Sequence, residues 1–203
     1  MRASGSDRTI ACPASVSLPR APRPISESRD KAVEWGNLVH HWKETGEWDP
    51  PFASPSDIKT LVKKLKVSGV KSEDWWPDPG THELTFALEL DGLKALEWDP
   101  SCGVNRDDWK AAFPADEWLT GTIDYLVIGE GRPWLDDLKT GRWRVDPVTS
   151  KQLRSYALYP WVLAGCAPDF EIEVSITQWT KYPLSGSPER SWHQLTHRLS
   201  FAC

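Results

Sequence analysis

Several features are scarce or missing in this sequence, and each absence excludes a class of protein. No apolar run of about 18 residues occurs, so we expect no membrane-spanning helix. The first 20 residues lack the apolar stretch of a signal peptide, which favours a cytoplasmic protein. The four cysteines form no CxxC pair, so neither a zinc knuckle nor a thioredoxin-type motif is encoded. A net charge of −5 excludes a global positive field and leaves only a local basic patch to bind nucleic acid.

What the chain does contain is enough apolar material for a core. Its 203 residues predict a single domain over 1–203, with an irregular lead-in over 1–27 that is rich in Ser, Pro and Arg. The apolar fraction of 39% is low, but it includes 13 tryptophans. Because each Trp can bury roughly 150–250 Å², we expect a stable globular fold rather than a disordered chain.

The spacing of apolar residues changes along the chain from a helical period to an alternating one. Helical spacing predicts helices over 28–45, 56–67 and 149–165, the last with Thr149 or Ser150 as N-cap. Alternation predicts strands over 82–90, 93–98, 121–128, 133–139, 172–179 and 191–201. Residues 99–118 are expected to be an irregular, charged excursion. This order favours an α/β or α+β fold, with helices around a mixed sheet.

The hairpin formed by 121–128 and 133–139 is the most informative segment. If residues 129–132 form its loop, Tyr125 faces Asp136 and Asp124 faces Asp137. Opposed residues share a sheet face at roughly 4.5–5.5 Å between Cβ atoms. Lys139 lies two residues beyond Asp137 and therefore points to the same face. Asp136 should point away and be structural.

Two carboxylates held about 5 Å apart repel each other by about 3 kcal/mol at an effective dielectric constant near 20. A divalent cation between them would turn this repulsion into binding energy. Alternatively, the two acids lie at a hydrated sheet edge, where Lys139 neutralises one of them. The spacing alone leaves both interpretations open.

Four motifs in order resemble the RecB-type branch of the PD-(D/E)XK nucleases, which includes phage exonucleases. They are Cys12-Pro13, the GxxxH spacing from Gly36 to His40, GTID followed by DLKTG, and Gln152-x-x-x-Tyr156. The resemblance runs from about residue 10 to about residue 180. It implies a restriction-endonuclease-like core and a bacterial or phage source.

The resemblance also implies roles for individual residues. His40, Asp124, Asp137 and the backbone carbonyl of Leu138 would be metal ligands, and Lys139 would be the catalytic lysine. Gln152 and Tyr156, four residues apart on one helix face, would complete the active site.

The implied reaction is hydrolysis of DNA phosphodiester bonds with Mg²⁺ or Mn²⁺, leaving a 5′-phosphate and a 3′-hydroxyl. Lys139 would orient or deprotonate the water, or stabilise the charge that develops on the phosphate. Glu83 could add a carboxylate, but we expect an exposed glutamate at a strand end. His41 is expected at the surface, and Gly36 is expected to leave room for a strand or for DNA.

DNA binding requires cations near the site. Residues 139–154 carry five basic residues against Asp146, a local net charge of +4. We expect Arg142, Arg144, Lys151 and Arg154 to contact DNA, with the lysine-rich helix 56–67 as a second candidate. Trp143 could stack on unpaired bases.

The sequence leaves two further possibilities open. The chain could be a non-catalytic DNA-binding or scaffold subunit beside a helicase or recombination protein, or a nuclease of CRISPR adaptation. We expect no membrane partner. We also expect no iron–sulfur cluster, because Cys12, Cys102, Cys166 and Cys203 lie in four separate parts of the sequence.

Overall fold

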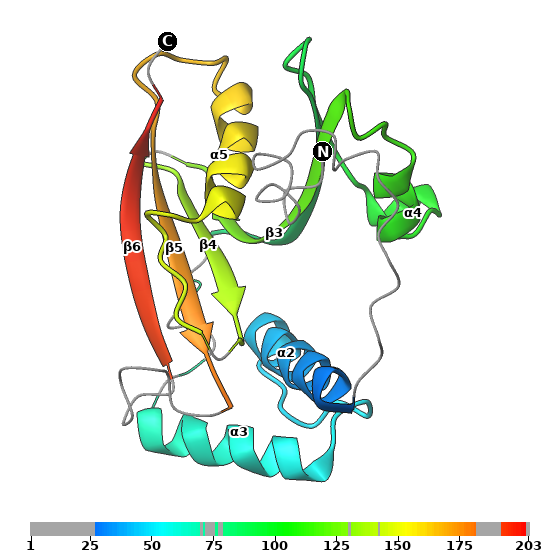
Figure 1. Cartoon of the computed structure of the whole chain (residues 1–203), viewed down its shortest axis with the longest axis vertical. Helices are drawn as coiled ribbons and strands as arrows, with labels where there is room; N and C mark the ends of the chain where they lie inside the picture. Colours follow the sequence, from blue (N-terminus) through cyan, green and yellow to red (C-terminus); the bar gives the residue numbers. More distant parts are fainter. Residues whose placement is uncertain are drawn as a thin grey trace.

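Six strands form one mixed sheet in the part of the chain that the computed structural model describes (Figure 1). The described residues are 27–69, 71, 76, 79–129, 131–141, 143–181 and 192–201, with the side chains of 27–30, 192 and 193 left aside. The strand order is β2-β1-β3-β4-β5-β6. The strands are β1 (Thr81–Glu89), β2 (Ala95–Glu97), β3 (Trp118–Val127), β4 (Trp134–Lys139), β5 (Glu171–Trp179) and β6 (Trp192–Ser200).

The helices are α2 (Glu27–Thr45), α3 (Pro55–Ser68), α4 (Arg106–Ala111) and α5 (Lys151–Leu163), with a short 3-10 turn η4 (Pro100–Cys102). Local chemistry explains two of their ends. The Ser150 hydroxyl accepts a hydrogen bond from the Leu153 backbone N–H at 3.3 Å, which makes Ser150 the N-cap of α5. Gly69 ends α3 in the left-handed conformation that glycine favours.

The pairing of the strands explains where α5 lies. Neighbouring strands are antiparallel except β4 and β5, which are parallel. Parallel neighbours need a long crossover connection, usually a helix. Here α5 is that crossover, and it covers one face of the sheet (Figure 1).

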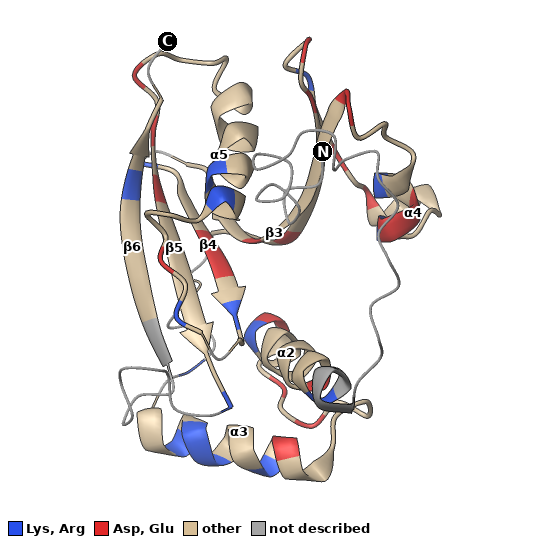
Figure 2. Ribbon diagram, viewed as in Figure 1, with Lys and Arg blue, Asp and Glu red and all other residues tan. Residues whose placement is uncertain are grey.

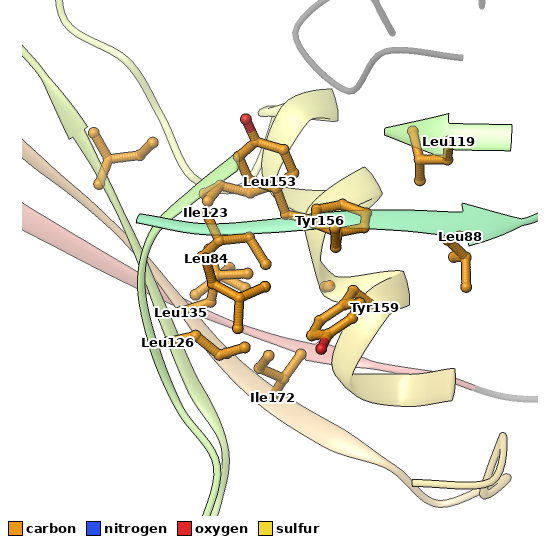
Figure 3. Close-up of a cluster of buried hydrophobic side chains, with 14 residues drawn as sticks. Leu84, Leu88, Leu119, Ile123, Leu126, Leu135, Leu153, Tyr156, Tyr159 and Ile172 are labelled. Atoms are coloured by element: carbon orange, nitrogen blue, oxygen red, sulfur yellow. The ribbon is translucent and has the colours of Figure 1, made fainter. Parts of the chain in front are cut away.

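Two clusters of buried side chains lie against the sheet. The first packs Leu153, Tyr156 and Tyr159 of α5 against β1, β3, β4 and β5 (Figure 3). The second packs Trp35 and Trp42 of α2 with buried residues of α3, β3, β4 and β5. The tryptophans therefore contribute mainly to the second cluster.

One irregularity interrupts β1 and β3 at the same place. Residues two apart in a regular strand share a face, yet Ile123 packs in the first cluster and Tyr125 in the second. On β1, Leu84 likewise lies in the first cluster, whereas His82 contacts Tyr125 edge-on. Glu83, with a φ of +50°, is the residue in between on β1. The side-chain alternation therefore changes face at this point, opposite Asp124.

The sequence-based expectation of an α+β fold with a mixed sheet and flanking helices is confirmed. The excursion over 99–118 is less irregular than expected, because Asn105 caps the short helix α4 by accepting from the Asp107 and Asp108 backbone N–H groups. The described residues include no helix with the length and apolar character that a bilayer span requires.

Candidate active site

The predicted hairpin register is confirmed over three pairs, Tyr125 with Asp136, Leu126 with Leu135 and Val127 with Trp134. The expectation that Asp124 faces Asp137 as the next pair is wrong. The ladder stops, and Asp124 Oδ2 instead accepts a hydrogen bond of 2.6 Å from the Leu138 backbone N–H. Beyond Asp136, β4 pairs with β5 as far as Lys139, while β3 stays paired with β1 on both sides of Asp124.

A chain of polar contacts leads from β4 to α5. The Lys139 ammonium lies 2.5 Å from Asp137 Oδ2. It also donates to Gln152 Oε1 at 3.0 Å, and the Gln152 amide donates to the Tyr156 hydroxyl at 2.8 Å. We call these four residues the lysine side of the site. Contacts among these four side chains fix their positions relative to one another.

Burial gives the lysine side its electrostatic character. Asp137 is buried and Lys139 is only partly accessible. Burial alone would lower the pKa of Lys139, but the charges of Asp137 and Asp124 outweigh it and raise the pKa above its usual value. Burial and the charge of Asp137 also raise the pKa of the Tyr156 hydroxyl. At neutral pH, Lys139 is therefore protonated and positively charged, and the Tyr156 hydroxyl is protonated and neutral.

Small residues make room for this arrangement. A Cβ on Gly121, the glycine of GTID, would lie 2.7 Å from Tyr156 Cε1. A Cβ on Gly36 would lie 3.1 Å from Thr140 Oγ1, directly after β4. The room that Gly36 was expected to leave is thus taken by the chain itself.

A second group of side chains lies across the site, and we call it the triad. His40 of α2, Glu83 of β1 and Asp124 of β3 place one potential ligand atom each within 4.8 Å of one another. His40 Nδ1 lies 3.4 Å from Glu83 Oε1, and Arg106 of α4 donates to Glu83 Oε2 at 2.6 Å. One imidazole nitrogen and two carboxylate oxygens in this spacing could hold a metal ion, and the spacing does not specify which.

The pKa values within the triad show that its charges are not in balance. Burial, and then the charge of Asp137, raise the pKa of Asp124 to about 7. Burial works against the charged form of His40, but the hydrogen bond with Glu83 and the charge of Asp124 outweigh it and raise its pKa. Burial would raise the pKa of Glu83, but His40 and Arg106 lower it on balance. Asp124 is therefore the carboxylate whose ionisation needs another cation.

Glu83 is the residue that sequence reasoning misplaced. It was expected to be exposed at a strand end, whereas it is partly buried and belongs to the triad. Register counting could have placed it opposite Asp124 only if the β1–β3 pairing were known. The long excursion between those strands hides that pairing from the sequence. Its positive φ is also not signalled by its residue type, since glutamate rarely adopts it.

The other predicted residues are distributed as follows. Asp137 is not part of the group within 4.8 Å, although its charge acts on Asp124. The Leu138 side chain is buried in the second cluster, and the role of its carbonyl stays a prediction. Asp136 is buried and structural, as expected, and accepts from Trp76 Nε1 at 2.7 Å and from the Ser175 hydroxyl. His41 is partly buried rather than at the surface, edge-on to Phe52.

The predicted DNA-contacting residues that the structure describes lie on α5 and in the segment between β4 and α5. Figure 2 shows basic residues on α3 and α5 and acidic residues on β3, β4 and α4. Arg144 and Trp143 are exposed in the segment between β4 and α5, and Arg142 lies outside the described residues. Lys151 and Arg154 line a pocket of about 690 Å³ between α5 and β6, together with Arg198. Cys12, Pro13 and Cys203 also lie outside the described residues, so the absence of an iron–sulfur cluster stays a prediction.

Comparisons with known proteins do not identify the chain. No protein-family model and no curated protein matches it. A solved structure titled "Crystal structure of SSO0001" is similar, with 13% identity and a TM-score of 0.32 over 94% of this chain and 74% of that one. A likeness this low carries no argument about function.

Proposed function

We propose that the chain is a metal-dependent deoxyribonuclease of the RecB-type branch of the PD-(D/E)XK nucleases, with a restriction-endonuclease-like core. The observation that carries the proposal is the meeting of the lysine side and the triad at one place in the fold. Lys139, Gln152 and Tyr156 form a hydrogen-bonded chain next to Asp137. The PD-(D/E)XK resemblance names these residues as an active-site set.

The residues present fit a divalent cation. His40, Glu83 and Asp124 offer one nitrogen and two carboxylate oxygens within 4.8 Å of one another. Burial and then the charge of Asp137 raise the pKa of Asp124, and the neighbouring His40 and Lys139 do not fully offset them. A divalent cation held there would supply Lewis-acid activation of water and charge neutralisation at a phosphate.

Lys139 fits a role as a fixed positive charge. Its raised pKa keeps it protonated, and Gln152 and Asp137 fix the position of its ammonium group. A preorganised cation stabilises negative charge that develops on a phosphate in the transition state. In the proposed reaction, water forms a bond to phosphorus and the bond to the 3′ oxygen breaks. The products are a 5′-phosphate and a 3′-hydroxyl.

The test is hydrolysis of end-labelled DNA. Linear and circular molecules, single- and double-stranded, are incubated with Mg²⁺, Mn²⁺ or EDTA. We expect cleavage with either metal and none with EDTA. Circular substrates separate endonuclease from exonuclease action, and the label at each end reports polarity.

Two pairs of variants connect the activity to the site. Asp137→Ala should abolish cleavage, whereas Asp116→Asn, at an exposed acid on the excursion, should not change it. Lys139→Ala should abolish cleavage, whereas Lys94→Ala, at an exposed lysine, should not. Cleavage by Asp137→Ala or Lys139→Ala at the wild-type rate contradicts the proposal. Metal binding without any cleavage by the wild-type protein favours the non-catalytic subunit instead.

A further inference from the structure

A pocket of about 970 Å³ opens beside the triad and extends toward the excursion between β2 and β3. Its walls come from α2, β1, β3 and the excursion, and they include all three triad residues. The segment between β2 and β3, residues 98–117, contributes Trp98, Arg106 and Lys110, none of which belongs to the motifs of the nuclease resemblance. Its volume falls at the upper end of the range, roughly 300–1,000 Å³, of pockets that enclose one small ligand.

Trp98 has the properties of a fixed aromatic platform. Its indole Nε1 donates to the Val104 carbonyl at 2.9 Å, which fixes the orientation of the ring. The side chain is partly exposed and lines the pocket. Within the described part of the chain, its ring stacks on no other ring. By contrast, Trp109 of α4 and Trp118 of β3 both pack against Phe113.

Lys110 supplies a positive charge on the same wall. Its side chain is 19% exposed, so most of its length is covered and its ammonium is held near the pocket. Its ion pair with Asp107, at 3.0 Å, involves a carboxylate that is 88% exposed. Such exposed pairs contribute little, so the ammonium can exchange this partner for a phosphate at small cost.

Three acidic residues of the pocket wall are engaged by protein groups, and a fourth, Glu44 of α2, is exposed. Glu83 is bound by His40 and Arg106, and Glu97 accepts from the Tyr159 hydroxyl. Asp124 accepts from the Leu138 N–H but keeps a raised pKa. Arg106 is bound to Glu83 of the triad, whereas Lys110 contacts no acid of the triad. Lys110 is therefore the positive charge on this wall that we expect to contact a phosphate of DNA.

We propose, on the basis of the proposed nuclease function, that this pocket takes an unpaired stretch of DNA, with one base stacked on Trp98 and a backbone phosphate beside Lys110. Bases inside a duplex are stacked on both faces, so a duplex offers no free base to an aromatic ring. An unpaired base does, and every base type can stack, so the preference is for single strands rather than for a sequence. The strand is thereby held with its phosphates close to the triad.

The experiment measures binding separately from cleavage. A fluorescent single-stranded oligonucleotide and a duplex of the same sequence are titrated by anisotropy with Mg²⁺ present. Lys139→Ala is the background, so that the DNA is not consumed. We expect this protein to bind the single strand more tightly than the duplex. Trp98→Ala should weaken single-strand binding about 5- to 150-fold and change duplex binding little, as expected for loss of base stacking.

Matched variants distinguish stacking from loss of structure. Trp98→Phe keeps a ring without the Nε1–H donor and should retain most of the single-strand affinity. Trp48→Ala removes a half-exposed tryptophan outside the pocket and should have no effect. Lys110→Ala should lower the salt dependence of single-strand binding by about 0.7 in slope, the value for one lost phosphate contact. Lys94→Ala should leave that slope unchanged.

Equal single-strand affinity in Trp98→Ala and its parent overturns the proposal, as does tighter binding of the duplex by the parent. An unchanged slope in Lys110→Ala overturns the assigned phosphate contact. Failure of the nuclease function gives a different result, namely no cleavage by the wild-type protein while the binding differences remain.

Discussion

The lysine side and the triad share one site but differ in how their charges are satisfied. On the lysine side, one ion pair and two hydrogen bonds link Asp137, Lys139, Gln152 and Tyr156 within the protein. In the triad, His40 and Arg106 both contact Glu83, and burial and the charge of Asp137 raise the pKa of Asp124 to about 7. The lysine side is therefore held in position by contacts within the protein, whereas the ionised form of the triad would be stabilised by an added cation.

We expect substitutions on the lysine side to affect DNA cleavage and substitutions in the triad to affect metal binding. The largest effect is expected on cleavage, from the lysine side. Lys139→Ala should lower the rate of DNA cleavage by about 10²–10³-fold or more, the loss typical of one preorganised charge-stabilising group. Mn²⁺ affinity, measured by calorimetry, should stay within a few-fold of wild type. A loss of Mn²⁺ binding equal to the loss of cleavage would show that the halves are not separable.

The triad should show the opposite pattern. Glu83→Gln removes a charge from the group of possible ligands while keeping a side chain of nearly the same shape. We expect Mn²⁺ affinity to fall at least about 10- to 100-fold, the loss typical of altering a residue that only supports a metal ligand. Glu89→Gln, on the same strand, is the matched control and should bind Mn²⁺ as wild type does. Unchanged Mn²⁺ affinity in Glu83→Gln would place the cation between Asp124 and Asp137 instead.

Packing beneath the lysine side can be tested without changing any charge. Gly121→Ala places a Cβ about 2.7 Å from Tyr156 Cε1 and 3.0 Å from Phe86 Cε1. Overpacking of this kind costs about 1–3 kcal/mol of unfolding free energy. Cleavage should fall because Tyr156 and Gln152 shift. Gly129→Ala meets no atom within 4 Å and should change neither property in denaturant titrations and cleavage assays.

The triad should also make stability depend on pH. The pKa of Asp124 rises from 3.8 when unperturbed to about 7 in the folded, metal-free protein. Folding thus favours the protonated form of Asp124. The contribution of this group to the free energy of unfolding is greatest below about pH 4 and is lost as pH rises through 7. Relative to Asp124→Asn, the wild type should lose about 3–4 kcal/mol of unfolding free energy between pH 4 and 8.

Thermal or urea unfolding of both proteins in EDTA measures this difference. At pH 8, Mn²⁺ should restore the unfolding free energy of the wild type but not change that of Asp124→Asn, because only the carboxylate is stabilised by the cation. A difference that does not vary with pH would contradict the assigned ionisation.

The smallest expected effect concerns the basic residues beyond the lysine side. Replacing Arg144, Lys151 and Arg154 together by Gln should flatten the salt dependence of duplex binding by about 0.9 for each lost phosphate contact. Single replacements show which basic residues contact DNA, because Lys151 and Arg154 line the pocket between α5 and β6, whereas Arg144 does not. An unchanged slope would move the DNA contacts to Lys59, Lys63 and Lys66 of α3.

The sequence by itself determined most of the lysine side. A short hairpin fixes its own register, so counting from the loop placed Tyr125 opposite Asp136. Alternation then placed Asp137 and Lys139 together, and helical spacing placed Gln152 with Tyr156. These are local relations, with periods of 2 and 3.6 residues, that any sequence displays directly.

Only the tertiary structure decided the triad and the pocket beside it. Asp124 is released from the hairpin because β4 continues along β5, and Glu83 meets Asp124 through a pairing of strands about 30 residues apart. The segment between β2 and β3 that carries Trp98 and Lys110 reaches the pocket only after β1 and β3 have paired. Such contacts depend on how distant segments pack, and on a positive φ at Glu83 that its residue type does not signal.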